Sequence, residues 1–319
     1  MSEQPHTERL YLGIGVSGAL LRAALVRADG QVVERREGAL ERGALAAQAA
    51  RFATELRDAA GKGSLSGVGC GVPGLVSPET GNVVISTDLP SAVRGDFRQE
   101  LERATNLPVT MENDANAAAY GEYVVGAGRG SRHMFYITIG AGIGGALIFD
   151  GKLWRGASGF AGEFGHITID PEGIECACGN VGCLETVASA PNIVRRANER
   201  LLRDSTSSLS RLGLSKDFTA ADIAHEARSG DDFALLMIER TGRYIGTGIA
   251  AVINLLNVER IVLGGGVMDA GELILDPIIR EAGRRSFQPC FEATQIVAAS
   301  LGPDAVPIGA AMLARDATK

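Results

Sequence analysis

Apolar residues in this chain fall in short runs separated by glycine, proline and aspartate, and this pattern predicts an alternation of strands and helices. Residues 10–17 and 21–28 predict two strands, and Asp29-Gly30 predicts a hairpin turn into a third strand at 31–36. Further strands are predicted at 67–72, 81–86, 109–112, 134–139, 146–149, 260–263 and 295–298. Helices are predicted at 44–60, 96–105, 113–125, 189–203, 219–229, 232–256, from 277 onward and at 305–317.

The order of strand, glycine turn, strand and Asp-Gly turn occurs twice, at 10–36 and again from 134 to 151. Ordinary hairpin chemistry is one explanation of this repeated order. We favour the other, a duplicated unit of the βββαβα type, which indicates a chain of two α/β halves.

Composition limits the class of protein. The 319 residues allow two domains, and a hydrophobic content of 45% allows substantial cores. A net charge of −7 argues against nucleic acid as the main partner. The polar first ten residues lack the apolar core of a signal peptide, and no run of about 18 apolar residues is present to span a membrane. We expect a cytoplasmic protein with no membrane partner.

Three of the five cysteines lie within eight residues, spaced C-x-C-x4-C. Cys176, Cys178 and Cys183 follow His166, which lies ten residues before the first of them. Three thiolates and one imidazole form a closed tetrahedral shell that suits structural Zn²⁺ and leaves no open position for water. The alternative is a set of ordinary reduced cysteines. Their tight clustering with a histidine favours zinc.

Asp114 follows a predicted strand and stands at the start of a helix, in the stretch E-N-D-A-N. A carboxylate at the carboxyl edge of a strand points toward the place where α/β proteins bind ligands. Within reach of a substrate hydroxyl it can act as a general base. The competing interpretation is a helix cap, since the first turn of a helix favours aspartate.

Two glycine-rich turns follow predicted strands, G-A-G-I-G-G at 140–145 and G-G-G at 264–266. Such turns let backbone N–H groups approach an anion, as phosphate loops do. Each is a weak signal alone, because glycine turns are common. Together with Asp114 at a third strand end, they indicate nucleotide-dependent phosphoryl transfer.

The motifs, taken together, resemble the ROK (repressor, open reading frame, kinase) family of sugar kinases and sugar-responsive repressors, and its bacterial glucokinases above all. The resemblance covers nearly the whole chain. It is carried by E-N-D-A-N-A-A-A (112–119), G-A-G-I-G-G (140–145), G-E-F-G-H (162–166), C-A-C-G-N-V-G-C-L-E (176–185) and I-V-L-G-G-G-V (261–267).

This resemblance implies an α/β, two-domain actin-like fold with a ligand cleft between the domains. The N-terminal domain would comprise residues 1–120 plus about 303–319, and the C-terminal domain residues 121–302 with the zinc motif. It implies a hexose and MgATP as substrates and a homodimer or homotetramer. Asp114 would be the general base toward the sugar 6-hydroxyl, and His166 would hold zinc with one ring nitrogen while the other faces the sugar. The implied sugar-binding residues are Gly74, Asp88, Asn113, Asp114, Glu163, His166 and Glu185. The implied nucleotide-binding residues are Gly18, Gly140, Ala141, Gly142, Gly144, Gly264, Gly265 and Gly266.

The sequence departs from the family at the phosphate side. The family's first phosphate loop resembles D-I-G-G-T-K, whereas the corresponding stretch here, 15–20, is G-V-S-G-A-L. Gly15 and Ala19 replace the acidic and hydroxyl residues, Ala141 replaces a threonine of the second loop, and Asp88 stands for a usual asparagine. Losing one preorganised electrostatic contact typically costs about 10²–10³ in rate.

Two functions follow. We expect an ATP-dependent hexose kinase that prefers glucose, with N-acetylmannosamine, N-acetylglucosamine, fructose and allose as alternative sugars. The competing prediction is a relative that binds sugar with weak or lost kinase activity and acts as a sensor or regulatory partner; deliberate alteration of the first loop is a third explanation of its sequence. A repressor is disfavoured, because only about ten residues precede Tyr11 and the chain is acidic.

Overall fold

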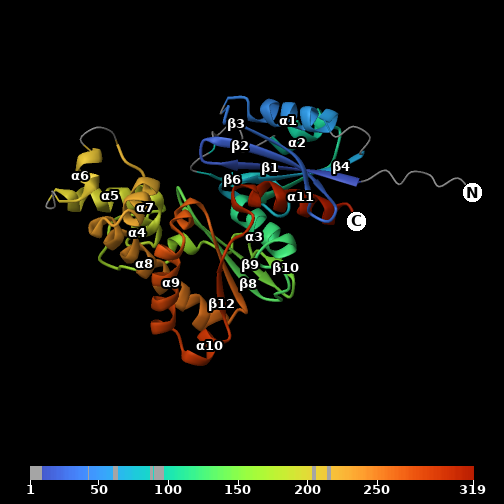
Figure 1. The fold of residues 1–319 in the computed structure, drawn as a ribbon. Coiled ribbons are helices and arrows are strands. Elements are labelled where there is room, and N and C mark those ends of the chain that lie inside the picture. The colour runs from blue at the N-terminus through green and yellow to red at the C-terminus, as the bar shows by residue number, and fades with distance from the viewer. Residues whose placement is uncertain are drawn as a thin grey trace, which may run out of the picture. The chain divides into compact units, whose positions relative to one another are not determined.

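The structure is a computed structural model of the chain, and it describes residues 9–41, 43–59, 64–86, 89, 97–202, 206–213 and 217–319 (Figure 1). Asp88, a predicted sugar contact, lies outside these residues, as does the predicted helix start at Asp96.

The first sheet has five strands in the order β3-β2-β1-β4-β7. Its central strand β1 is antiparallel to β2 and parallel to β4, and β4 is parallel to β7. Residues 10 to 16 of β1 are all buried, as expected for a strand that is covered on both faces. The strands are β1 (Arg9–Ser17), β2 (Leu20–Arg27), β3 (Val32–Ala39), β4 (Ser64–Val72) and β7 (Val109–Asn113).

The second sheet repeats this arrangement, in the order β10-β9-β8-β11-β12. In both sheets the first three strands in sequence form an antiparallel meander, and two further parallel strands continue from the first of them. This equal order agrees with the predicted duplication. The strands are β8 (Met134–Ile139), β9 (Ile143–Phe149), β10 (Lys152–Trp154), β11 (Arg260–Gly264) and β12 (Gln295–Ala298), and a separate hairpin pairs β5 (Leu75–Val76) with β6 (Val83–Ile85).

Helices cover both faces of the first sheet (Figure 1). On one face, α1 (Leu45–Ala59) and α2 (Phe97–Thr105) bury Leu56 and Leu101 against alternate β1 side chains such as Leu12 and Ile14. On the other face lie α3 (Asp114–Val125) and α11 (Ala305–Ala317), where Ile308 belongs to a cluster with Tyr11 of β1 and Val26 of β2.

Glycine sets the distance between α11 and the sheet. A Cβ on Gly13 of β1 would lie 1.7 Å from the Pro307 carbonyl oxygen, and one on Gly69 of β4 would lie 1.8 Å from that of Ala310. Only glycine permits this approach of helix backbone to strand backbone. The helix therefore holds the carboxyl ends of β1 and β4 in fixed relation to α3.

The other helices follow the second set of strands. α8 and α9 pack closely, because a Cβ on Gly242 of α8 would lie 2.7 Å from the Pro277 Cβ of α9. A capping box between Thr219 and Asp222 begins α7. These helices are α4 (Glu185–Ala188), α5 (Ala190–Leu201), α6 (Ser208–Gly213), α7 (Ala220–Arg228), α8 (Asp232–Leu256), α9 (Glu272–Arg285) and α10 (Gln288–Glu292).

Several predicted boundaries differ from the structure, and two of the differences have a clear local cause. The strand expected from Ala146 begins at Ile143, because the backbone is already extended there and only the first three residues of G-A-G-I-G-G form the turn. The helix expected from Pro277 begins at Glu272, and the proline lies inside it. Proline is common in the first turn of a helix, but it does not by itself fix where the helix starts. Here the helix starts directly after Gly271, which has a φ of +65°. The short helices α4, α6 and α10 were not predicted.

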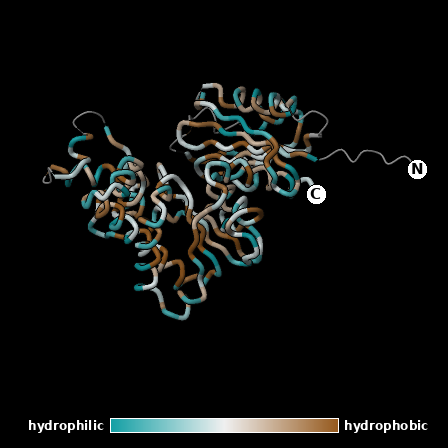
Figure 2. Tube along the Cα trace, viewed as in Figure 1, coloured by the Kyte–Doolittle hydropathy of each residue, from teal (hydrophilic) through white to brown (hydrophobic). Residues whose placement is uncertain are grey.

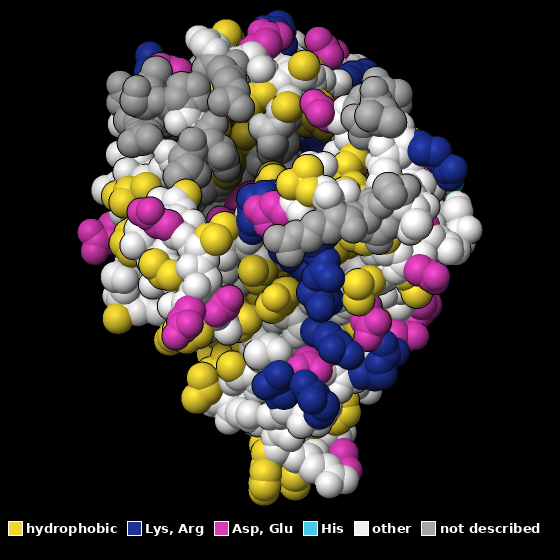
Figure 3. Space-filling view, turned by 90° about the vertical axis from the view of Figure 1, so that its left-hand side faces the viewer, with side chains coloured by type: hydrophobic (Ala, Val, Ile, Leu, Met, Phe, Trp, Pro, Cys, Tyr) yellow, Lys and Arg dark blue, Asp and Glu magenta, His cyan; other side chains and the backbone are white. Residues whose placement is uncertain are grey.

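Contacts divide the chain into two compact units: residues 1–130 with 146–161 and 300–319, and residues 131–145 with 162–299. The domain boundaries expected from sequence stay a prediction. Hydrophobic residues concentrate along the strands and on the inner sides of helices (Figure 2). In one view, several Lys and Arg side chains lie near one another on the surface, beside acidic and hydrophobic ones (Figure 3). Among the described residues, no helix has the length and hydropathy that crossing a membrane requires.

Candidate functional site

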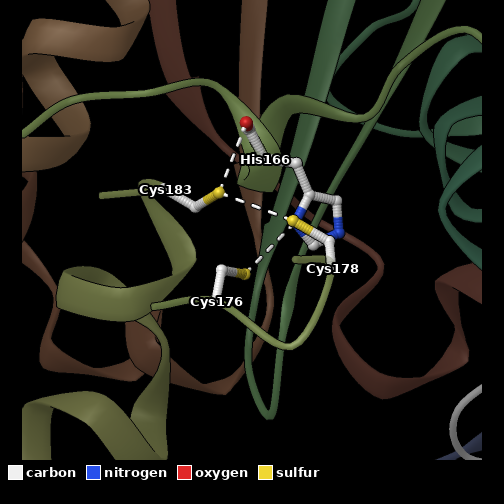
Figure 4. Close-up of side chains that lie close together, drawn as sticks. All are labelled: His166, Cys176, Cys178 and Cys183. Atoms are coloured by element: carbon white, nitrogen blue, oxygen red, sulfur yellow. Dashed lines mark hydrogen bonds between the residues drawn. The ribbon is translucent and has the colours of Figure 1, made fainter. Parts of the chain in front are cut away.

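The predicted zinc ligands converge (Figure 4). The ligand atoms of His166, Cys176, Cys178 and Cys183 all lie within 4.8 Å of one another. The sulfurs of Cys178 and Cys183 are 3.7 Å apart, and the Cys176 sulfur lies 3.7 Å from His166 Nδ1. Zn–S and Zn–N bonds of ordinary length place tetrahedral ligands about 3.6–3.8 Å apart. Two of the six ligand pairs thus have tetrahedral spacing, and all four groups lie close enough together to hold one Zn²⁺.

The chain reaches this geometry through glycine. Gly182 has a φ of +72°, and a Cβ there would lie 1.5 Å from the Asp170 carbonyl oxygen. Burial raises the pKa of the Cys183 thiol to about 12, whereas the Asn180 backbone hydrogen bond lowers the pKa of Cys178. A buried thiol with a raised pKa becomes a thiolate at neutral pH only when a cation stabilises it, which is the contribution of a bound metal.

The other ring nitrogen of His166 faces a carboxylate. His166 Nε2 lies 3.8 Å from Glu163 Oε2, on the opposite side of the ring from the sulfur cluster. Desolvation raises the pKa of Glu163, the His166 imidazole opposes this rise, and Glu185 adds to it. Three groups predicted to bind sugar hydroxyls are thus brought close together. Phe164 anchors them, because its buried ring packs edge-on against Phe135 of β8, with centroids 5.4 Å apart.

The glycine-rich turn after β8 is already in contact with an anionic side chain. Glu185 Oε2 accepts a hydrogen bond of 2.8 Å from the Ile143 backbone N–H. A Cβ on Gly142 would lie 2.7 Å from the same oxygen, so a side chain at this position would shift the carboxylate. Gly140 closes the turn, since its N–H donates to the Gly142 carbonyl at 2.8 Å. Gly144 lies within strand β9, so the turn itself contains only three of the predicted loop residues, Ala141 being the middle one.

Asp114 lies where β7 meets α3. The helix cap is its neighbour Asn113, whose side-chain oxygen accepts from the Asn116 N–H at 3.0 Å. The capping role that competed with catalysis for Asp114 therefore belongs to Asn113. Asp114 is the first helical residue, and its Oδ1 accepts from the Ala115 N–H at 2.9 Å and from Asn113 Nδ2 at 3.2 Å. Asn113 Nδ2 also donates to the Gly74 carbonyl at 3.0 Å, which brings the predicted residue Gly74 to the same place.

Packing accounts for two of the three glycines at the end of β11, Gly264 and Gly265. A Cβ on Gly264 would lie 2.6 Å from the Tyr136 hydroxyl, and one on Gly265 would lie 2.4 Å from the Ile139 carbonyl oxygen. Gly266 is different, because it lines a cavity of about 50 Å³ together with Val267, Asp269 and residues of α5, α7 and α8. Of the three glycines predicted to contact the nucleotide, only Gly266 therefore remains without a packing explanation.

The altered first loop forms the turn between β1 and β2. Gly18 lies at its tip with a φ of +58°, and Ser17 pairs with Leu20 across it. A side chain on Gly15 has no room, since its Cβ would lie 2.8 Å from Val306 Cγ1 and 3.1 Å from Pro307 Cδ. Val306 Cγ1 also blocks Gly71, at 2.6 Å. An apolar side chain thus fills the space beside position 15, where the family resemblance implies an acidic residue.

Sequence reasoning missed this Val306 contact, and it missed two buried acids. Glu122 is fully buried and accepts backbone N–H bonds from Ala127, Ser300 and Leu301, which ties the end of α3 to the start of α11. Glu112 is buried at the end of β7 and paired with Arg155. The signal for Glu112 was present, because a charged residue at an otherwise buried strand position needs a partner.

By contacts within the chain, the candidate residues fall into the two units. The first unit holds Gly15, Gly18, Gly74, Asn113 and Asp114. The second holds the four zinc ligands, Glu163, Glu185 and the glycine turns at 140–142 and 264–266.

Comparison with known proteins identifies the family. The ROK family model matches residues 11–317. A glucokinase from Halalkalibacterium halodurans is 37% identical, over 97% of this chain and 96% of its own length. The crystal structure of a ROK family glucokinase from Streptomyces griseus, in complex with glucose and AMPPNP, superposes with a TM-score of 0.84 at 32% identity and covers 96% of this chain and 99% of that one.

A ROK family transcriptional regulator, a homologue of the E. coli MLC protein, superposes with a TM-score of 0.87 at 29% identity, over 98% of this chain and 78% of its own. Both kinases and regulators are therefore similar to this chain. The predicted actin-like α/β fold class is confirmed by these structures. The chain belongs to the ROK family.

Proposed function

We propose that this protein is an ATP-dependent sugar kinase that phosphorylates a hexose, with glucose preferred, at the 6-hydroxyl. The observation that carries the proposal is the Asp114 carboxylate, held at the β7–α3 junction while Asn113 serves as the helix cap. The relatives support the choice of reaction, since full-length similarity is to glucokinases.

In this reaction Asp114 accepts the proton of the 6-hydroxyl as that oxygen attacks the γ-phosphorus of ATP. The new oxygen–phosphorus bond forms, the bond between the γ-phosphorus and the β–γ bridging oxygen breaks, and ADP leaves with its electron pair. Asn113, Glu163, His166 and Glu185 bind sugar hydroxyls and orient the attacking oxygen. Mg²⁺ accompanies ATP and neutralises charge on its phosphates.

Bound Zn²⁺ would be held by His166, Cys176, Cys178 and Cys183, and it would supply structural rigidity to this loop. The chain's own part is to present His166 with Nδ1 on the metal side, which leaves Nε2 for the sugar and Glu163. We propose that the protein acts as a homodimer or homotetramer in the cytoplasm, as the family resemblance implies.

The zinc proposal has a direct test. Cys178→Ser should reduce zinc from close to one per chain to a small fraction, and should lower the melting temperature, because metal binding to the native state contributes folding free energy. Cys290→Ser is the matched control, since Cys290 lies outside the cluster. Metal analysis of each purified variant measures its zinc content, and thermal unfolding measures its melting temperature. Wild-type protein that folds fully without zinc would contradict the proposal.

The kinase proposal is tested by ADP release with MgATP across a hexose panel, beside Asp114→Asn. Sugar-dependent turnover should fall by about 10²–10⁴-fold in the variant, the range for a general base. Turnover equal in both proteins would reject Asp114 as the base.

One observation favours a second function. Val306 and Pro307 fill the space beside Gly15, at the position where the family carries an acidic residue. This supports a sugar-binding protein with weak or lost kinase activity, acting as a sensor or regulatory partner. Sugar binding without ADP release in the same assay would favour it.

A further inference from the structure

Glu112 is a buried carboxylate two positions before Asp114, and Arg155 reaches it from the loop that follows β10. Glu112 is 6% exposed, and its Oε2 accepts from Arg155 Nε at 2.9 Å and from Nη2 at 2.6 Å. A buried carboxylate without such a partner would be strongly destabilising. Arg155 therefore supplies the partner that the buried Glu112 carboxylate requires near the carboxyl end of β7.

The other oxygen of Glu112 connects this ion pair to the proposed base. Its Oε1 accepts from the Asn113 backbone N–H and from Asn116 Nδ2, each at 3.0 Å. Asn116 in turn donates its backbone N–H to Asn113 Oδ1, and Asn113 Nδ2 donates to Asp114 Oδ1. A continuous set of hydrogen bonds thus runs from the Arg155 guanidinium to the Asp114 carboxylate.

Only a carboxylate suits the position of Glu112. Donors surround it on both sides, two from Arg155 and two from the asparagines. A glutamine of the same shape has one accepting oxygen and would turn its NH₂ group toward donors on one side. The negative charge and the two accepting oxygens are both used.

Arg155 itself stands on a fixed support. Its carbonyl oxygen accepts from the Ala161 N–H at 3.0 Å, which closes the loop from 155 to 161. Gly159 in this loop, with a φ of +91°, packs so closely on Pro78 that a Cβ would lie 2.3 Å from Pro78 Cγ. These two contacts hold the backbone from which the Arg155 guanidinium reaches Glu112.

We propose, on the basis of the proposed kinase function, that Glu112 and Arg155 are positioning residues that hold Asn113 and Asp114 in the orientation needed for proton transfer. A helix start alone does not require them, because Asn113 already caps α3. What the ion pair adds is a fixed Asn113 amide, and through it a fixed Asp114 Oδ1.

The test compares Glu112→Gln, Arg155→Met and Arg155→Lys with wild type in ADP release with MgATP and the preferred hexose. Glu112→Gln and Arg155→Met should lower kcat by about 10–100-fold, the usual effect of groups that orient a reacting residue. The KM for sugar should change less than kcat, because among the proposed hydroxyl-binding groups only Asn113 and Asp114 depend on this network, while Glu163, His166 and Glu185 are untouched. Arg155→Lys, which keeps the charge, should recover part of kcat.

Glu281→Gln is the matched control. Glu281 is equally buried at 6% exposed and is bonded to Arg284, at 2.7 Å, and to Arg285, but it lies on α9 in the other unit. It should lower the melting temperature as the Glu112 and Arg155 variants do and leave kcat unchanged. If Glu112→Gln fails to fold, the two variants Arg155→Met and Arg155→Lys provide the test. The Arg155 side chain is 35% exposed, so its replacement should disturb folding less.

The outcomes separate the inference from the function on which it rests. Loss of turnover in Asp114→Asn together with kcat within about twofold of wild type in Glu112→Gln and Arg155→Met would overturn the inference alone. Wild-type protein without hexose-dependent turnover, or undiminished turnover in Asp114→Asn, would overturn the proposed kinase function and the inference with it.

Discussion

At the scale of single residues, the motif residues were predictable from sequence and their surroundings were not. Cysteine spacing predicted the cluster around His166, because thiolates within eight residues can reach one metal. The contact between Gly15 and Val306 joins residues almost three hundred positions apart, and nothing local marks it. The same is true of Glu112 and Arg155, whose pairing depends on how a loop folds back.

The Gly15 contact leads to a prediction about restoring the acidic residue. Gly15→Asp alone should destabilise the protein by about 1–3 kcal/mol, because its Cβ would overlap Val306 Cγ1 in a packed core. Combining it with Val306→Ala removes the closest contact and should return much of this stability. Denaturant unfolding measures the free energy of each variant, and Val306→Ala alone is the control.

The same pair of variants addresses activity. If the altered loop limits phosphoryl transfer, Gly15→Asp with Val306→Ala should raise kcat/KM for MgATP above the wild-type value, since a carboxylate there can help to position the metal. An unchanged kcat/KM in a stable double variant would show that the loop does not limit the reaction.

At the scale of elements, the hydrophobic pattern predicted most strands and helices because their periodicity is local. The duplicated strand order was also visible, through the two matching hairpins. The failures have local causes. The start of β9 lies within a glycine-rich stretch, where glycine usually indicates a turn, and α9 contains a proline that the sequence placed at its start.

The spacing between α11 and the first sheet gives a prediction at this scale. Gly13→Ala should destabilise the protein by more than about 3 kcal/mol, because its Cβ would lie 1.7 Å from a backbone oxygen that cannot move alone. Gly18→Ala is the contrast: its Cβ meets open space, and the cost is about 1–2 kcal/mol for an alanine at positive φ. Thermal unfolding of both variants checks the difference; equal losses would mean that the close helix approach is not a constraint.

At the scale of the whole molecule, the two sheets share one strand order but carry different chemistry. The first carries the proposed base at the end of β7, and the second carries the zinc cluster and the carboxylates beside it. Duplication thus explains the architecture, while function depends on the loops in which the copies differ. The repeat alone predicted two α/β halves, whereas the actin-like fold class and the activity were predicted from the family resemblance that the individual motifs carry.

Ligand-dependent stability of the intact protein separates the two proposed functions. A ligand that binds the native state at about one hundred times its Kd stabilises it by about 2.7 kcal/mol, so a hexose should raise the melting temperature under either function. A working kinase should also be stabilised by Mg²⁺ with a non-hydrolysable ATP analogue, whereas a sugar sensor with Val306 beside its altered loop should respond to the hexose alone. Melting curves with each ligand, and with both, measure this; Glu163→Gln should lose the hexose shift and retain the nucleotide shift. A nucleotide shift as large as the hexose shift would reject the sensor, and its absence in a protein that still responds to hexose would reject the kinase.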